Sequence, residues 1–158
     1  MSFDVKGTCT AMIMGLSHVA LVASDIEKAF SFYCGVLGFE RLFDINNEDG
    51  SIRLSYIKIT DGQFFELFNG KNASPSHERD TGLLHLPDYL GFSHLCLEVD
   101  DIHEIAERLR TNNALIAEPK IGKDSNYQCW GLDPDLNKIE FMQFMADSPQ
   151  KQTKPSGK

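Results

Sequence analysis

Few features of the more specialised protein classes occur in this sequence. Its 158 residues include four cysteines, and no two of them form a Cys-x-x-Cys pair. The four are Cys9, Cys34, Cys96 and Cys129. Their wide spacing favours reduced thiols that behave as small apolar residues. No apolar run is long enough to cross a bilayer and no stretch resembles a signal peptide, so we expect a cytoplasmic protein.

Positive charge is also scarce. Lys and Arg number 15 against 23 Asp and Glu, the formal net charge is -8 and the pI is about 5.0. This balance argues against nucleic acid or an anionic membrane surface as the main partner, and we expect a small-molecule substrate instead. The hydrophobic and charged shares, 42% and 24%, are typical of a soluble globular protein. The length fits one domain, or two small modules that share a core.

A repeat is present in the chain. The stretch "GLSHVALVASDI" at 15–26 and the stretch "GFSHLCLEVDDI" at 91–102 agree at six of twelve positions. Each reads as a strand that ends in Asp-Ile, and each is followed by apolar residues at helical spacing. Three strand-like segments separated by turns then follow in both halves. The sequence therefore predicts a duplicated β-α-β-β-β unit.

The predicted fold is α+β, with two tandem βαβββ modules that form a cupped mixed sheet. We expect the first module over 14–70 and the second over 91–145, since the repeat defines both. An amino-terminal extension over 1–13, a polar connector over 71–90 and a flexible tail over 146–158 account for the rest. The helix of each module protects one face of its sheet, and the two open faces can enclose a binding cleft.

Each predicted module carries a histidine on its first strand and a glutamate on its last. Strand alternation turns His18 and His94 away from the main apolar rows. Glu66 and Glu140 stand between apolar neighbours, and they follow the two histidines by 48 and 46 residues. A carboxylate buried on a strand is costly without a partner. Two His and two Glu that converge on one cleft are a plausible metal-ligand set.

Simpler interpretations exist for each of these residues taken alone. A single strand histidine is usually a core residue with its hydrogen bonds satisfied, and a single strand glutamate usually lies on a solvated face or sheet edge. The duplicated His-to-Glu pattern is much harder to explain in that way. His77, His85 and His103 have no counterpart in the other half, and we interpret them as surface or local-structure residues.

Several segments resemble the vicinal oxygen chelate superfamily. They are "SHVALVASDIEKAFSFYCGVLGFE", "FFELF", "SHLCLEVDDI" and "WGLDPDLNKIEFMQ". The resemblance covers about residues 14–145. Members include glyoxalase I, extradiol dioxygenases, methylmalonyl-CoA epimerase, and the fosfomycin and bleomycin resistance proteins. The family fold is the paired βαβββ module.

The resemblance implies a metal site. The four metal positions of the family fall on His18, Glu66, His94 and Glu140, and this set is most similar to that of glyoxalase I. Extradiol dioxygenases typically have two His and one Glu, the epimerase generally has Gln in place of Glu66, and bleomycin-binding members have no such set. One divalent ion (Ni, Zn, Co, Mn or Fe) and a homodimer are implied as well.

The expected function is that of a glyoxalase I-like lyase or isomerase of the lactoylglutathione lyase type. A small carbonyl compound, such as a thiol conjugate of a 2-oxoaldehyde, would pass through an enediolate stabilised by the ion, with Glu140 and Glu66 as candidate bases. Val22 stands where glyoxalase I usually has an Arg that helps to hold glutathione, and "ELFNG" replaces "ELTxNWG". An extradiol-type dioxygenase and a drug-binding resistance protein are the alternatives.

Candidate substrate-binding residues follow from strand alternation and from one loop. Phe64, Phe68 and Met142 should share a sheet face with the ligands, which favours a substrate with a hydrophobic or aromatic part. The loop before the seventh strand can reach over the mouth of the cleft. It offers Lys123, Asn126, Tyr127 and Gln128. A solvated turn is an equally good interpretation of this loop.

Overall fold

The computed structural model describes residues 14–71 and 92–153, and it contains the predicted β-α-β-β-β unit twice. The first module consists of β1 (His18–Ala23), α1 (Ile26–Phe30), η1 (Ser31–Val36), β2 (Glu40–Asn46), β3 (Ile52–Thr60) and β4 (Gln63–Asn69). The second consists of β5 (Leu95–Glu98), α2 (Ile102–Thr111), β6 (Leu115–Ile121), β7 (Tyr127–Leu132), β8 (Lys138–Gln143) and α3 (Pro149–Thr153). The predicted fold class is confirmed.

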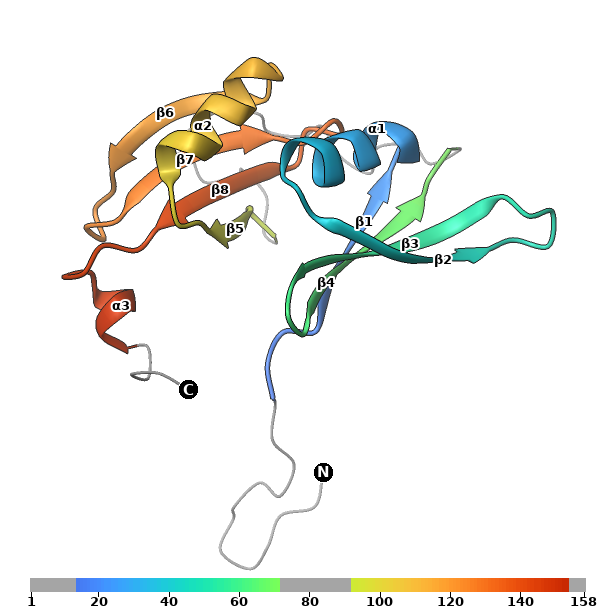
Figure 1. Cartoon of the computed structure of the whole chain (residues 1–158), viewed down its shortest axis with the longest axis horizontal. Coiled ribbons are helices and arrows are strands. Elements are labelled where there is room, and N and C mark those ends of the chain that lie inside the picture. The colour runs from blue at the N-terminus through green and yellow to red at the C-terminus, as the bar shows by residue number, and fades with distance from the viewer. Residues whose placement is uncertain (1–13, 72–91, 154–158) are drawn as a thin grey trace, which may run out of the picture.

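Each module builds one four-stranded mixed sheet. The strand orders are β1-β4-β3-β2 and β5-β8-β7-β6, so the two sheets repeat the same arrangement. The first strand pairs in parallel with the last, and the remaining pairs are antiparallel. In Figure 1, α1 and α2 lie over the same side of the two neighbouring sheets. Because first and last strands are adjacent, residues far apart in the sequence become neighbours.

The helices α1 and α2, which follow the first strand of each module, both begin with an aspartate N-cap. Asp25 accepts hydrogen bonds from the backbone N–H groups of Glu27 and Lys28, and Asp101 accepts them from those of His103 and Glu104. These bonds satisfy donors that a helix start leaves unpaired. The first helix continues after α1 as the π-helical turn η1. Gly38 and Asn113, with φ of 79° and 54°, follow the two helices in the left-handed conformation that commonly ends a helix.

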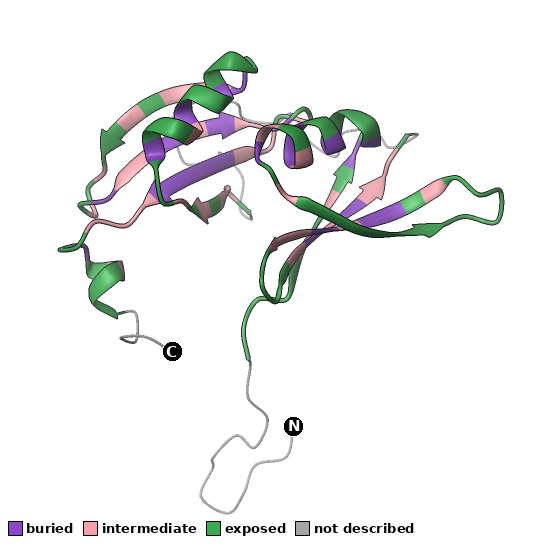
Figure 2. Ribbon diagram, viewed as in Figure 1, coloured by how far each residue is buried: buried purple, intermediate pink, exposed green. Residues whose placement is uncertain are grey.

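The hydrophobic core lies between the helices and the sheets. Val19 and Leu21 of β1 pack against it, whereas His18, Ala20 and Val22 are exposed, which confirms the predicted alternation along this strand. Leu95, Leu97 and Val99 repeat this packing in the second module. Figure 2 shows buried residues on the sides of α1 and α2 that face the sheets. One face of each sheet is thus covered by a helix.

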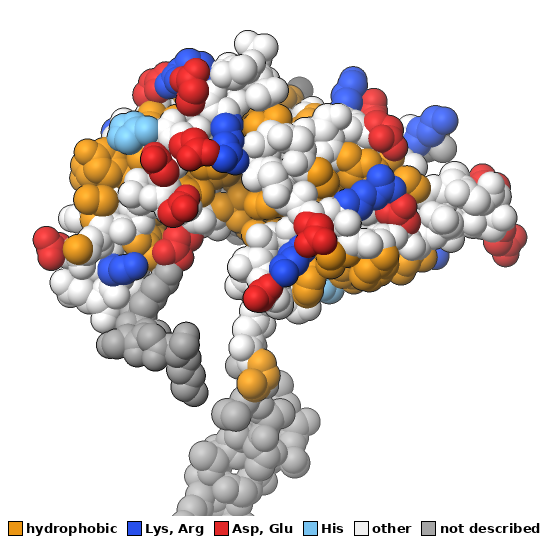
Figure 3. Space-filling view, in the orientation of Figure 1, with side chains coloured by type: hydrophobic (Ala, Val, Ile, Leu, Met, Phe, Trp, Pro, Cys, Tyr) orange, Lys and Arg blue, Asp and Glu red, His pale blue; other side chains and the backbone are white. Residues whose placement is uncertain are grey.

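The edge strand β2 carries apolar side chains that the chain leaves uncovered. Leu42, Phe43 and Ile45 are 40%, 51% and 45% exposed. Figure 3 shows hydrophobic side chains gathered along this part of the molecule. Exposed apolar patches of this kind commonly mark a surface that binds another molecule.

Two polar contacts join the modules behind the sheets. The hydroxyl of Tyr33 in η1 donates a hydrogen bond of 2.7 Å to Asp133, which is 4% exposed. The backbone N–H of Ser24 donates to both carboxylate oxygens of Asp135 at 3.2 and 3.1 Å. The predicted turn between β7 and β8 therefore holds the second module against the end of β1.

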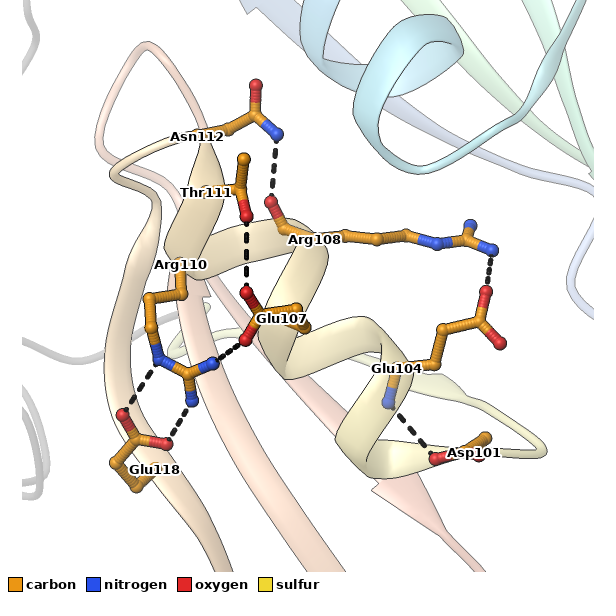
Figure 4. A network of polar contacts seen from close by, with 8 residues as sticks. All are labelled: Asp101, Glu104, Glu107, Arg108, Arg110, Thr111, Asn112 and Glu118. Carbon is orange, nitrogen blue, oxygen red and sulfur yellow. Dashed lines mark hydrogen bonds and ion pairs between the residues drawn. The ribbon is translucent and has the colours of Figure 1, made fainter.

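The outer face of α2 is a solvated network of charges (Figure 4). Arg110 contacts Glu107 and binds Glu118 of β6 through two hydrogen bonds, at 3.3 and 2.6 Å. Arg108 pairs with Glu104 one turn away. Exposed pairs of this kind contribute little to stability because water and salt screen them. The network supports the helix locally and leaves no charge cluster that needs a ligand.

The carboxyl-terminal segment differs from the predicted flexible tail, because the structure has α3 within it. Ser148 is buried and bonds to the first turn, and the Gln150 side chain hydrogen-bonds to Asp124 and Asn126 at 2.9 Å each. These local polar contacts anchor a segment that has no apolar pattern of its own. Predictions for 1–13, most of the connector (72–90) and His77 and His85 lie outside the described residues.

Cys34, Cys96 and Cys129 are free thiols within the described ranges. No helix among the residues that the structure describes is both long and apolar enough to span a membrane.

Candidate metal centre

The first predicted ligand pair is formed on adjacent strands. β1 and β4 run parallel, with Ala20 opposite Glu66, so His18 and Glu66 share the open face of the first sheet. His18 Nε2 lies 3.7 Å from Glu66 Oε2. The side chain of His18 is 41% exposed and that of Glu66 is 17% exposed. The pair is therefore accessible from outside the module.

The second pair repeats this arrangement. Cys96 is opposite Glu140 in the parallel pairing of β5 with β8, and His94 directly precedes β5. His94 Nε2 lies 3.2 Å from Glu140 Oε2, while Nδ1 lies 3.1 Å from the hydroxyl of Ser93. This second contact orients the imidazole so that Nε2 faces the carboxylate.

The structure brings the four predicted ligands together as two separate His-Glu pairs. The pairs belong to different sheets, and within 14–71 and 92–153 no three His, Cys, Asp or Glu side chains are grouped closely enough to hold a metal ion. The structure thus supplies two half-sites with one imidazole and one carboxylate each. A site that uses all four residues stays a prediction.

Aromatic residues surround the first pair. Tyr56 of β3 is directly opposite Glu66, and its hydroxyl donates a hydrogen bond of 3.0 Å to Glu66 Oε1. This bond to the carboxylate raises the pKa of Tyr56. The ring stacks on Phe43 at 4.9 Å between centroids and meets Phe64 edge-on at 6.3 Å.

Sequence reasoning missed Tyr56 because no local pattern singles it out. The turn of the β3–β4 hairpin was the only sequence feature that could have predicted which residue lies opposite Glu66. The two-residue turn at Asp61-Gly62 pairs Thr60 with Gln63, and an unshifted register would place Ile57 opposite Glu66. A register shift between Lys58 and Thr60 places Tyr56 there instead.

The second pair has a different neighbour at the equivalent place. Trp130 of β7 is opposite Glu140, and its ring meets the His94 ring edge-on at 4.8 Å. Among the described residues its indole Nε1 is buried and has no hydrogen-bond partner. Desolvation of the thiol and the nearby Glu140 raise the pKa of Cys96 to about 12, so this thiol stays protonated at neutral pH.

Some predicted substrate-binding residues do lie on the ligand faces. Phe64 is opposite His18, and Phe68 is opposite Val22 in the same pairing. Met142 and Gln128 are paired on the second sheet, two residues from Glu140 and Trp130 along their strands. The two open faces are therefore largely apolar around their His-Glu pairs.

The remaining predicted substrate contacts lie elsewhere. Asn126 is fully buried, and its amide bonds to Asp124, Gln150 and the backbone N–H of Met145. Tyr127 packs on the helix side against His103, and Lys123 is exposed in the turn. The structure therefore engages Asn126 inside the protein and turns Tyr127 toward the helix, away from the open face that carries the ligand pair.

A separate cleft of about 640 Å³ lies between the modules. Leu37, Phe39 and Ile59 of the first module line it, and Leu97, Ile105 and Phe141 of the second lie across from them. None of the four predicted ligands lines this cleft, although Cys96 and Glu98 reach it from β5.

The paired βαβββ architecture defines the fold class, and sequence comparison identifies the family. Residues 15–141 match the family model of the glyoxalase/bleomycin resistance protein/dioxygenase superfamily. The chain belongs to this superfamily.

The proteins similar to this chain are named for more than one activity. A lactoylglutathione lyase of Neisseria meningitidis is 30% identical over 135 residues, which are 82% of this chain and 91% of that protein. An ethylmalonyl-CoA/methylmalonyl-CoA epimerase of Cereibacter sphaeroides is 31% identical over 114 residues, 70% of this chain and 82% of that protein. A fosfomycin resistance protein of Listeria monocytogenes has a similar structure, with a TM-score of 0.61, 16% identity and coverage of 85% and 96%.

Proposed function

We propose that this protein is a divalent-metal-dependent lyase or isomerase of the glyoxalase I type. The observation that carries the proposal is the equivalence of two pairs, His18 with Glu66 and His94 with Glu140, on the open faces of two repeated sheets. A polar pair that recurs at the same place in both modules is harder to explain as an isolated surface contact. Lactoylglutathione lyase relatives at about 30% identity support the same class.

The donor atoms fit a divalent ion. Two ligands bound about 2.1 Å from one ion, at tetrahedral or octahedral angles, lie about 3.0–3.4 Å apart. His94 and Glu140 are already at 3.2 Å, and His18 and Glu66, at 3.7 Å, need only a small side-chain adjustment. Two imidazoles and two carboxylates suit Ni, Zn, Co, Mn or Fe, and leave positions for water or substrate.

We infer that the complete site is shared between two copies of the chain. Each copy presents a half-site on each of its two sheets, and both half-sites are partly exposed. In a two-fold homodimer the first module of one copy can face the second module of the other, which completes two identical sites.

The carboxylates supply the proton chemistry. When bound, the ion would polarise a carbonyl of the substrate. Glu140 or Glu66 takes a proton from the neighbouring carbon and returns it to the next carbon, as a positioned general base does. The imidazoles of His18 and His94 would hold the ion beside these carboxylates.

The expected substrate is a small carbonyl compound with an apolar or aromatic part. Val22 is 52% exposed on the ligand face, and Phe64, Phe68 and Met142 supply further apolar surface. β3 contributes one lysine, Lys58, to this face. Its Nζ forms an ion pair with Asp61 Oδ1 at 2.6 Å. This lining favours an uncharged group over the carboxylates of glutathione.

Metal analysis of mixed variants tests the shared site. His18→Ala and His94→Ala are each expected to abolish metal binding at stoichiometric levels in the homodimer. When the two variants are mixed and allowed to reassociate, a hybrid dimer keeps one intact site, so about a quarter of the wild-type metal content should return. His103→Ala, which changes an exposed helix residue, is the control and should bind metal normally.

Normal metal content in either single variant would rule out the ligand assignment. Loss in both variants without recovery on mixing would place the site within one chain. These two results separate the ligand prediction from the dimer prediction.

Turnover assays identify the reaction. Methylglyoxal with several thiols, in protein loaded with each divalent metal, should give a lactoyl thioester with at least one combination. Oxygen uptake with catechols by the Fe(II) protein would favour a dioxygenase instead. Drug binding without turnover that survives in the His18→Ala/His94→Ala double variant would favour a resistance protein.

A further inference from the structure

The two carboxylate oxygens of Glu66 have different neighbours. Oε2 faces His18 Nε2 at 3.7 Å, and Oε1 accepts a hydrogen bond of 3.0 Å from the hydroxyl of Tyr56. A carboxylate held at one oxygen has less freedom to rotate about its last torsion. The contact with Tyr56 therefore selects which oxygen is presented toward the imidazole.

The ring of Tyr56 is itself held on three sides. Phe43 stacks on it with an angle of 18° between the planes, Phe64 meets it edge-on, and the His18 ring approaches at 6.2 Å with an angle of 76°. Aromatic rings in these arrangements attract one another beyond simple burial. The direction of the hydroxyl is thus set by packing.

The second module has no tyrosine at the equivalent place. Trp130 stands opposite Glu140 as Tyr56 stands opposite Glu66, and its indole Nε1 has no partner among the described residues. Glu140 is instead hydrogen-bonded to the thiol of Cys96 on the adjacent strand β5. A tyrosine hydroxyl that donates to the glutamate is therefore particular to the first half-site, and it does not follow from the repeated fold.

We propose that Tyr56 is a positioning residue for Glu66, which it holds with Oε1 engaged and Oε2 free to bind the ion. This inference rests on the proposed function, in which Glu66 is a ligand. Hydrogen bonds from the second layer around a metal typically contribute about 10–100-fold to metal affinity. Loss of the hydroxyl leaves both oxygens free to rotate and weakens the site.

Tyr56→Phe tests the proposal because it removes the hydroxyl and keeps the ring. We expect about a tenfold or greater loss of Co²⁺ affinity, measured by competition with a chelator, and a changed visible absorption spectrum of the bound Co²⁺. Tyr33→Phe is the matched control, since it also removes a hydroxyl that donates to a carboxylate, but on the helix-covered face of the sheet, opposite the ligand face. Its Co²⁺ affinity and spectrum should equal those of the wild type.

Glu66→Ala separates this inference from the function on which it rests. Weak Co²⁺ binding in Glu66→Ala, together with wild-type affinity and spectrum in Tyr56→Phe, would overturn the role of Tyr56 and leave the proposed site intact. Wild-type binding in Glu66→Ala would overturn both. Equal loss in Tyr56→Phe and Tyr33→Phe would also count against the proposal, because it would indicate a general structural effect.

Discussion

The hydroxyl of Tyr33 donates a 2.7 Å hydrogen bond to Oδ2 of Asp133, and this buried contact joins the helix of the first module to the β7–β8 turn of the second. Asp133 also accepts hydrogen bonds from the backbone N–H groups of Asp135 and Asn137 and from the Asn137 amide. The turn that Asp133 organises is therefore the same turn that receives Ser24 of the first module through Asp135.

Tyr33→Phe is expected to destabilise the protein by about 1–3 kcal/mol, because a buried carboxylate loses one of its donors. Urea unfolding followed by circular dichroism measures this change. Serine hydroxyls on the surface give a comparison, and Ser31→Ala should cost less since its bond to the Glu27 carbonyl is exposed. A loss for Tyr33→Phe no larger than that of Ser31→Ala would show that the contact does not hold the modules together.

Val22→Arg is expected to introduce recognition of glutathione. Val22 is exposed on the ligand face, so a longer side chain fits without entering the core and should change stability by no more than about 0.5 kcal/mol. The added guanidinium can bind a carboxylate. Calorimetric titration with an S-alkyl glutathione should therefore show tighter binding in Val22→Arg than in the wild type.

Val22→Gln, which is polar but uncharged, is the control for this gain. Equal binding of the S-alkyl glutathione by all three proteins would mean that Val22 does not face the substrate. Tight binding by the wild type would contradict our expectation of an uncharged, apolar substrate group.

Acid should weaken the start of α2 through Asp101. The backbone N–H groups of Glu104 and His103 donate to this carboxylate, and they hold its pKa below the ordinary value of 3.8. Because the folded state binds this proton less readily than the unfolded state, the stabilisation is present above pH 3.8 and is lost as the pH falls through the lower folded value.

Asp101→Asn keeps a capping oxygen that does not titrate. The melting temperature of the wild type relative to Asp101→Asn should therefore fall between pH 6 and about pH 2.5, as followed by circular dichroism. A difference that stays constant over this range would show that the cap is not coupled to protonation.

Much of the fold was predictable because each module is specified by local patterns. Asp25 and Asp101 begin the helices as predicted, and Gly38 and Asn113 follow their ends. The alternation along β1 correctly separates His18 from the core-facing Val19. Period, caps and turns act over a few residues, so a sequence can report them directly.

The loop before β7 shows where local reasoning fails. Asn126 and Tyr127 are polar or amphipathic residues next to a turn, and their composition fits a solvated loop or a substrate contact equally well. The structure buries Asn126 against Gln150 of α3 and turns Tyr127 toward the helix. The burial of Asn126 depends on Gln150, which is distant in the sequence, and the direction of Tyr127 depends on where β7 begins. No local sequence pattern specifies either.

The sequence by itself determined the two βαβββ modules and the placing of one histidine and one glutamate on the first and last strand of each, since a duplicated pattern and a period of two suffice for that. Only the tertiary structure decided that the ligands meet as His18 with Glu66 and His94 with Glu140 on separate sheets, because the parallel pairing of first and last strands within each module joins residues that are far apart in the sequence. It also decided that Tyr56 reaches Glu66. A shift of one residue in strand pairing exchanges the two faces of a strand, and the shift between Lys58 and Thr60 is visible only once the strands are paired.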